Sequence, residues 1–151
     1  MRTTARPTLS ISFLKLRELQ SLSEKYITKF SISIPSVRTK PKSLSGGNQQ
    51  KVMLTVCLAA EPELLIVNDP TRGIDVGAKA EINKLLLEIA GQGVGIILFS
   101  AELPELMGLA DRILVMKKNS ISGELAGGEI TENAIMALAA SERGLKMGET
   151  A

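Results

Sequence analysis

The chain has 151 residues, of which 44% are hydrophobic and 23% charged, a composition typical of a globular domain and not of a disordered chain. Its formal net charge is +2, but residues 1–43 carry nine Lys and Arg against two acidic residues, whereas residues 44–151 carry nine against fourteen. No apolar run approaches the roughly 20 residues that a membrane-spanning helix needs, and the single cysteine excludes an internal disulfide.

The basic N-terminal part contains one expected helix. Residues 1–13 are predicted to be an irregular, solvated leader, because a nucleic-acid-binding arm would interleave aromatic side chains with its basic residues. Residues 31–42 are interrupted by Pro35 and Pro41 and are expected to be a connector. Between them, apolar residues recur every three or four positions from Leu14 onward, which predicts an amphipathic helix that packs on the core through Leu16, Leu19, Leu22, Tyr26 and Phe30.

A polar, glycine-bearing turn precedes the next helix. Two adjacent glycines, Gly46 and Gly47, stand directly before an apolar run, and Ser45 can cap the helix that follows. Backbone N–H groups at such a helix start approach anions closely, and the helix dipole favours negative charge there. The sequence therefore predicts a turn that contacts phosphate and a helix over residues 49–60, in which Cys57 is expected to be a packed thiol.

The rest of the chain alternates between expected strands and helices. Short apolar strands are predicted at 64–68 and 95–100, and a strand that is apolar on both faces is typical of a parallel sheet covered by helices. Helices are predicted at 78–90, 103–109 and 131–140, and two further strands at 111–116 and 121–125 are joined by a turn at 117–120. The first of these helices places four apolar residues on one face and ends at Gly91: Ile82, Leu85, Leu86 and Ile89. This order predicts an α/β sandwich.

Two motifs together resemble one known family. The string Leu44–Lys51 is similar to the signature motif of ATP-binding cassette (ABC) ATPases, in the form found in the second cassette of bacterial sugar importers, and Leu64–Lys79 resembles the Walker B and D-loop region of the same family. The resemblance runs from about Glu18 to Ala140. It implies a partial P-loop NTPase sandwich, with a mostly parallel sheet, flanking helices and a C-terminal β-hairpin. It also implies a division into a leader (1–13), the tail of a helical subdomain with its connector (14–43), the C-terminal part of the nucleotide-binding domain (44–140) and a flexible tail (141–151).

The chain departs from the family pattern where the family holds its own nucleotide. The Walker A loop, Gly-x-x-x-x-Gly-Lys-Ser/Thr, does not occur in this sequence. By the resemblance, Asn68 occupies the Walker B aspartate position that holds magnesium, and Asp69 occupies the position of the catalytic glutamate. Ala101 stands at the switch position, where a side chain would sense the γ-phosphate, and it cannot donate a hydrogen bond to one. A neutral amide and a shortened carboxylate weaken a metal site and misplace a base.

The part that would act on a partner's nucleotide matches the family pattern. The resemblance implies that Ser45, Gly46, Gly47 and Gln49 bind the nucleotide held by a second cassette, in trans. Asp75, in the D-loop, would lie at the seam between the two cassettes, and it equally suits a cap for the helix that follows. ATP and Mg²⁺ are therefore expected only in a complex with a complete cassette.

The resulting hypothesis is a truncated or degenerate ATP-binding subunit of an ABC sugar importer, with no ATPase activity in the isolated chain. The implied partners are the membrane permease subunits, a partner cassette in a homo- or heterodimer and, indirectly, a periplasmic sugar-binding protein, but no nucleic acid. The implied location is the cytoplasmic face of the inner membrane. One alternative is a non-catalytic remnant that docks a permease or cassette. A DNA-repair type ABC ATPase is disfavoured, because the stripe from Leu16 to Phe30 is too short for a long coiled coil.

Overall fold

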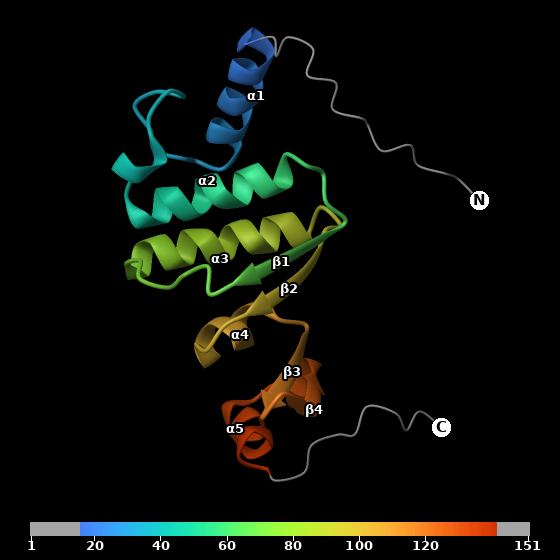
Figure 1. Ribbon diagram of the computed structural model, residues 1–151. Coiled ribbons are helices and arrows are strands. Elements are labelled where there is room, and N and C mark those ends of the chain that lie inside the picture. The colour runs from blue at the N-terminus through green and yellow to red at the C-terminus, as the bar shows by residue number, and fades with distance from the viewer. Residues whose placement is uncertain (1–15, 142–151) are drawn as a thin grey trace, which may run out of the picture. The chain divides into compact units, whose positions relative to one another are not determined.

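The computed structural model describes residues 16–141 (Figure 1). The predictions for the leader 1–13 and for residues 142–151 of the tail lie outside the described residues. The chain divides between Ala60 and Glu61 into two compact units, which are described in turn.

The first unit contains α1 (Leu16–Lys29), the short 3-10 helix η1 (Pro41–Ser43) and α2 (Gly46–Leu58). The predicted amphipathic helix is present, and its C-terminal end is ordered by a stacked pair of rings, Tyr26 on Phe30, with centroids 5.9 Å apart. Phe30 is buried, but Leu19 and Leu22 are 40% and 44% exposed. The prediction that the whole stripe packs on the core is therefore wrong at these two leucines, because no described element of the chain covers that part of the helix face.

Helix α2 begins three residues earlier than expected and ends two residues earlier. The early start follows from Ser45, which caps the helix at Gly46 and so draws both glycines into its first turn. Lys51 is buried, and its Nζ donates to the Ser31 carbonyl at 3.0 Å, so its charge is directed at the connector. Cys57 is exposed, which corrects the prediction of a packed thiol: it lies on the same outward side of α2 as Met53 and Val56.

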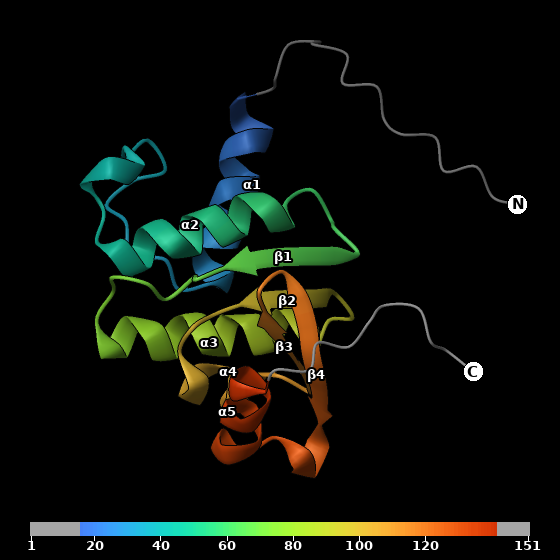
Figure 2. The ribbon, with the colours of Figure 1, turned by 60° about the horizontal axis from the view of Figure 1, so that its bottom comes forward.

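The second unit begins with a parallel pair of strands. Strand β1 (Leu64–Asn68) pairs with β2 (Gly95–Phe99), with Leu64 opposite Gly95. The connection runs through α3 (Val76–Ala90), which lies along the sheet in Figures 1 and 2. The predicted apolar face of this helix is confirmed, because all four of its residues are buried: Ile82, Leu85, Leu86 and Ile89.

The unit ends in an antiparallel hairpin. Strands β3 (Arg112–Lys117) and β4 (Ser120–Ala126) are joined through Lys118 and Asn119, whose φ angles of 48° and 62° are those of a type I′ turn. The predicted turn at 117–120 and the C-terminal β-hairpin are thus confirmed. The short 3-10 helix η2 (Gly127–Glu129) leads to α5 (Glu132–Ala140), which is capped by Thr131.

One small core holds this end of the chain together. Ile113 and Val115 of β3 and Ile135 of α5 are its buried centre. Helix α4 (Leu103–Leu109), which follows β2, adds Leu103 and Leu106 to the same cluster. The hairpin is therefore anchored to the segment that leaves β2 and is not an independent appendage.

One face of the parallel pair is not covered within the described residues. Alternation along the strands and the observed register place Leu64, Ile66, Ile97 and Phe99 on the same face, and these side chains are 52%, 64%, 44% and 47% exposed. Leu65 and Val67, on the opposite face, are buried. The expectation of a sheet covered on both faces thus holds for one face only, because α3 supplies cover on a single side.

Candidate functional site

The glycine-bearing turn of the first unit is a capped helix start. Asn48 donates to Ser45 Oγ twice, from its backbone nitrogen at 3.4 Å and from Nδ2 at 3.0 Å. The Ser45 oxygen is therefore used as an acceptor, whereas its own proton has no acceptor among the described residues. The N–H groups of the first turn, including those of Gly46 and Gly47, have no partner inside the helix. The exposed Ser45 hydroxyl thus stands beside the exposed residue Gly46 at the positive end of the helix dipole, whereas Gly47 is buried.

Two amide side chains fix the shape of this turn. Asn48 Oδ1 accepts a hydrogen bond from the backbone N–H of Ser33 at 2.8 Å, which ties the turn to the connector. Gln49 Nε2 donates to the Leu44 carbonyl at 2.8 Å and closes the turn from its other side. Sequence reasoning did not assign Asn48 any role. The signal for it was the run of four polar residues at 48–51, near the start of the helix.

The carboxyl ends of β1 and β2 bring several of the predicted site residues together. Asn68 is the last residue of β1 and is exposed, and Asp69 follows it with a φ of 44°. This left-handed conformation is one that Asp tolerates better than most residues, and such backbone outliers concentrate at functional sites. The Asp69 N–H donates to the Phe99 carbonyl at 2.8 Å, which extends the strand pairing by one residue.

Next to them, the end of β2 is held by a buried carboxylate. Ser100 Oγ donates to Glu105 Oε2 at 2.6 Å, and Ser100 Oγ also accepts from the Glu102 N–H at 3.0 Å. Glu105 is 7% exposed, and its other oxygen has no partner in this part of the structure. Ala101 is exposed, and its methyl side chain carries no polar group.

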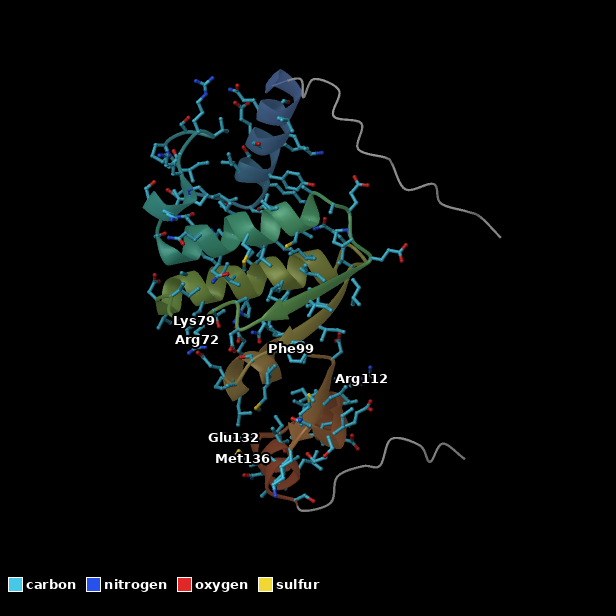
Figure 3. All side chains as sticks on the ribbon, viewed as in Figure 1. Arg72, Lys79, Phe99, Arg112, Glu132 and Met136 are labelled. Atoms are coloured by element: carbon cyan, nitrogen blue, oxygen red, sulfur yellow. The ribbon has the colours of Figure 1, made fainter. Side chains whose placement is uncertain are left out.

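An ion pair joins the segment after β2 to α3. Lys79 Nζ, labelled in Figure 3, donates to both carboxylate oxygens of Glu102, at 2.7 Å to Oε2. Both side chains are partly exposed, so the pair contributes little to stability, on the order of 1 kcal/mol or less. Its effect is positional, because it fixes where Ser100 and Ala101 leave the strand.

Asp75 lies at the N-terminus of α3, where its Oδ1 accepts from the Ala78 N–H at 2.9 Å. The capping role considered for it is therefore confirmed. A role at a seam between two cassettes stays a prediction.

A cleft of about 1140 Å³ lies within the second unit. Asn68, Asp69, Ser100 and Ala101 line one end of it, while its walls are the apolar residues of β2, β3 and the helices beside them. The structure thus brings together Asn68, Asp69 and Ala101, the positions predicted for the metal ligand, the base and the switch. This end of the cleft is called its mouth below.

The groups at this mouth supply one carboxylate and one amide as possible magnesium ligands. Mg²⁺ is usually held by one or two carboxylates together with water and substrate phosphates in octahedral geometry. At the end of β1 the chain offers the Asp69 carboxylate and the amide of Asn68. Across residues 16–141, no three Asp, Glu, Cys or His side chains lie close enough to hold a metal ion.

Among residues 16–141, no helix has the length and apolarity needed to cross a membrane.

Comparisons with known sequences show that the chain is similar to ATP-binding proteins of sugar importers. Residues 5–72 match the family described as ABC transporter. The ribose import ATP-binding protein RbsA 2 of Rhizobium meliloti is 48% identical over 130 residues, which are 86% of this chain and 25% of that protein. The xylose import ATP-binding protein XylG of Geobacillus kaustophilus is 50% identical over 117 residues, or 78% of this chain and 23% of that protein. The chain therefore spans about a quarter of the length of these curated relatives.

Solved structures show the same fold. A nucleotide-free ATP-binding cassette from an ABC transporter superposes with a TM-score of 0.72 at 24% identity, over 82% of this chain and 48% of that one. A dimeric cassette in a post-hydrolysis state, bound to ADP and phosphate, gives a TM-score of 0.66 at 20% identity, over 77% of this chain and 50% of that one. The α/β fold class predicted from the sequence is confirmed.

Proposed function

Because the chain belongs to the ATP-binding cassette family, we propose that it is part of the ATP-binding subunit of a bacterial sugar importer, and that it completes the ATP site of a partner cassette with its signature turn. The import function is supported by the names of the ribose and xylose import relatives. The chain spans only about a quarter of each relative. The transport of a sugar and the hydrolysis of ATP by the whole protein are therefore proposals for this chain.

The observation that carries the proposal is the free proton of Ser45. Two N–H groups of Asn48 occupy the Ser45 oxygen as an acceptor, so the O–H is left to donate to an external group. The N–H groups of Gly46, which is exposed, and Gly47, which is buried, lie beside it in the first turn of α2, where the helix dipole favours an anion. A phosphate oxygen of a bound nucleotide suits this set of donors. Gln49 supports the set by bonding the Leu44 carbonyl, which holds the turn in shape.

The other half of the proposal is that this chain does not hydrolyse ATP by itself. The mouth formed by Asn68, Asp69 and Ala101 offers one carboxylate where a metal ligand and a base are both needed. ATP and Mg²⁺ would then be bound by a complete cassette, with this chain closing over them. Asp75, which caps α3, would lie at the seam in that complex.

The partners follow from the same role. They are a complete cassette, the membrane permease of the importer and, through the permease, a periplasmic sugar-binding protein. The chain would work on the cytoplasmic face of the cell membrane, held there by the permease.

The test measures Mg²⁺-dependent ATP turnover by the chain alone and after mixing with the intact Rhizobium meliloti relative, which supplies a complete cassette. Wild-type chain and a Ser45→Arg variant are compared, because Arg fills the space of the turn and removes the hydroxyl donor. We expect no turnover by either chain alone. In the mixture, we expect a stimulation by the wild type that the variant lowers by about a hundredfold, the usual effect of losing one preorganised donor.

Turnover by the isolated wild type above that of Ser45→Arg would contradict the inactivity of the lone chain. Equal stimulation by both chains would contradict the role of the turn, and would favour a remnant that docks a partner without touching its nucleotide.

A further inference from the structure

A lysine is buried in the first unit, although lysine is among the residues least often found inside proteins. Lys51 lies in the second turn of α2 and is 5% exposed. Burying an ammonium group is costly unless the group is hydrogen-bonded, and an apolar side chain would fill the same space without that cost. Its Nζ donates to the Ser31 carbonyl at 3.0 Å. The lysine therefore joins α2 to the chain just beyond the end of α1 (Figure 1).

Ser31 occupies the left-handed position that ends α1. Its N–H donates to the Thr28 carbonyl at 3.3 Å, and the N–H of Ile32 donates to the Ile27 carbonyl at 2.9 Å. These are the two bonds of a Schellman cap, whose left-handed residue is most often glycine. Here a serine adopts a φ of 48°, between two neighbours that are each 5% exposed. This unfavourable conformation is held by the burial of its neighbours and by the bond from Lys51.

From this cap a chain of hydrogen bonds leads to the Ser45 hydroxyl. The Ser33 N–H, two residues beyond the cap, donates to Asn48 Oδ1 at 2.8 Å. Because a backbone N–H can only donate, it fixes which way the Asn48 amide points, and Nδ2 donates to Ser45 Oγ at 3.0 Å. Each bond in such a chain polarises the next group. The Ser45 hydroxyl is thereby made a stronger donor towards an external anion.

Asn48 and Lys51 act on the same short segment. They lie three positions apart and so share one face of α2. On this face, one accepts from the Ser33 N–H and the other donates to the Ser31 carbonyl. Two contacts fix the segment on the helix, whereas a single contact would let it pivot. The placement of the Asn48 amide therefore depends on the bond made by Lys51.

We propose that Lys51 is a positioning residue for the signature turn. By holding Ser31 in its left-handed conformation, it keeps the Ser33 N–H on the Asn48 amide. That amide in turn occupies the oxygen of Ser45, so that the hydroxyl proton is directed to a phosphate. This inference rests on the function proposed for Ser45. It adds a residue that acts on the turn without touching the nucleotide.

The first test compares Lys51→Met with wild type in the full chain labelled with ¹⁵N. Methionine preserves an unbranched side chain and removes the ammonium group, so no charge is left buried. The Ser33 amide is expected to exchange with solvent at least about tenfold faster in the variant, because its acceptor is no longer held in place. The side-chain amide signals of Asn48 should shift as well. The Phe30 amide, which bonds to the Tyr26 carbonyl within α1, is the internal reference.

Three further variants separate the bond from packing. Lys51→Arg keeps a charged donor and should retain slow exchange at Ser33. Ser31→Gly relieves the left-handed residue, so in the Lys51→Met background it should restore about half of the lost protection. Lys84→Met makes the same chemical change at a lysine whose side chain is 79% exposed, and it should leave the exchange of Ser33 unchanged.

The functional readout is Mg²⁺-dependent ATP turnover in the mixture with the intact Rhizobium meliloti relative. Lys51→Met should lower the maximal stimulation by about tenfold, less than Ser45→Arg does, because the donor is misplaced and not lost. The amount of chain that gives half of the maximal stimulation should stay the same, whereas a general loss of folded protein would raise it. Ser31→Gly should restore part of the stimulation in the Lys51→Met background.

A variant that leaves the buried lysine in place tests the next bond. Ser33→Pro removes the N–H that Asn48 accepts, at an exposed position, and should lower the maximal stimulation by a similar factor.

The inference is overturned by unchanged exchange of Ser33 in Lys51→Met, or by stimulation equal to wild type in Lys51→Met or Ser33→Pro. Failure of Ser31→Gly to restore either quantity has the same meaning. Equal stimulation by wild type and Ser45→Arg would overturn the ATP-site proposal and this inference with it. The exchange of Ser33 distinguishes the two failures, because it is measured without nucleotide and still responds to Lys51→Met when only the ATP-site proposal is wrong.

Discussion

At the end of β2, the carboxylate of Glu105 is held inside the protein by a single hydroxyl. Ser100 Oγ donates to one of its oxygens at 2.6 Å, while the other oxygen has no partner in the described part of the chain. A buried acceptor that loses its donor carries the full cost of desolvation, about 1–3 kcal/mol and more for a charged group. The pair therefore fixes the backbone just before Ala101, at the mouth of the cleft.

The first prediction concerns this hydrogen bond. Ser100→Ala should lower the free energy of unfolding by about 1–3 kcal/mol, because it leaves the Glu105 carboxylate buried without a donor. Urea unfolding of the full chain measures the change. Glu124→Gln is the control, since it weakens an exposed ion pair with Arg112 and should change stability by less than about 1 kcal/mol. Equal effects of the two substitutions would contradict the prediction.

At the residue scale, sequence reasoning placed the polar positions but not their conformations. The order of Asn68, Asp69 and Pro70 was enough to locate the mouth at the end of β1. The positive φ of Asp69 was not predictable, because its N–H pairs with Phe99, thirty positions further along the chain. Exposure of Cys57 was missed for a related reason: apolar neighbours in sequence do not show which side of a helix is covered.

At the scale of elements, α3 begins at a side-chain cap. Asp75→Ala should lower the free energy of unfolding by about 0.5–2 kcal/mol through loss of the bond to the Ala78 N–H. Asp75→Ser keeps a capping oxygen and should cost only a few tenths of a kcal/mol. Thermal or urea unfolding of the two variants measures the difference. Equal losses would show that the charge of Asp75, and not its cap, stabilises the helix start.

Helix α5 packs against β4 at a glycine. A Cβ built on Gly123 would lie 2.4 Å and 2.7 Å from the two Cδ atoms of Leu138. Gly123→Ala should therefore destabilise the protein by about 1–3 kcal/mol, as overpacked cores do. The double variant Gly123→Ala/Leu138→Ala should lose less than the sum of the two single changes, because removing Leu138 relieves the clash.

A matched glycine provides the control for that measurement. Gly108 lies in α4, and a Cβ added to it would meet no atom within 4 Å, so Gly108→Ala should stabilise the protein by a few tenths to about 1 kcal/mol. Additive losses in the Gly123 and Leu138 cycle would contradict a direct clash between them.

The elements themselves were largely predictable from the sequence. The bounds of β1 and α4 match those expected from apolar runs and their flanking residues, and the buried face of α3 follows from its periodicity. The start of α2 was set three residues too late although Ser45 was expected to cap the helix, because the low helix propensity of Gly46 and Gly47 favours a turn at these positions. Which strand pairs with which could not be derived from local patterns, since pairing depends on contacts distant in sequence.

On the scale of the whole molecule, the second unit leaves an apolar sheet face open. A further prediction follows for the full chain: Ile66→Thr should reduce binding of the dye ANS and lower self-association, while changing the free energy of unfolding by less than about 0.5 kcal/mol. Thr keeps the β-branched shape that suits a strand. Val67→Thr, one position along and buried at 4% exposure, is the control and should cost about 1–3 kcal/mol.

ANS fluorescence measures dye binding, and light scattering measures self-association. Urea unfolding measures the free energy of unfolding of both variants. Unchanged dye binding in Ile66→Thr would show that the open face is not the surface that the dye detects.

The open face of β1 and β2 also bears on the fate of the chain inside a cell. Proteins whose apolar surface is not shielded are selected by chaperones and proteases, so small differences in shielding alter abundance several-fold. The steady-state amount of the chain in a cell would then depend on how completely this face is covered.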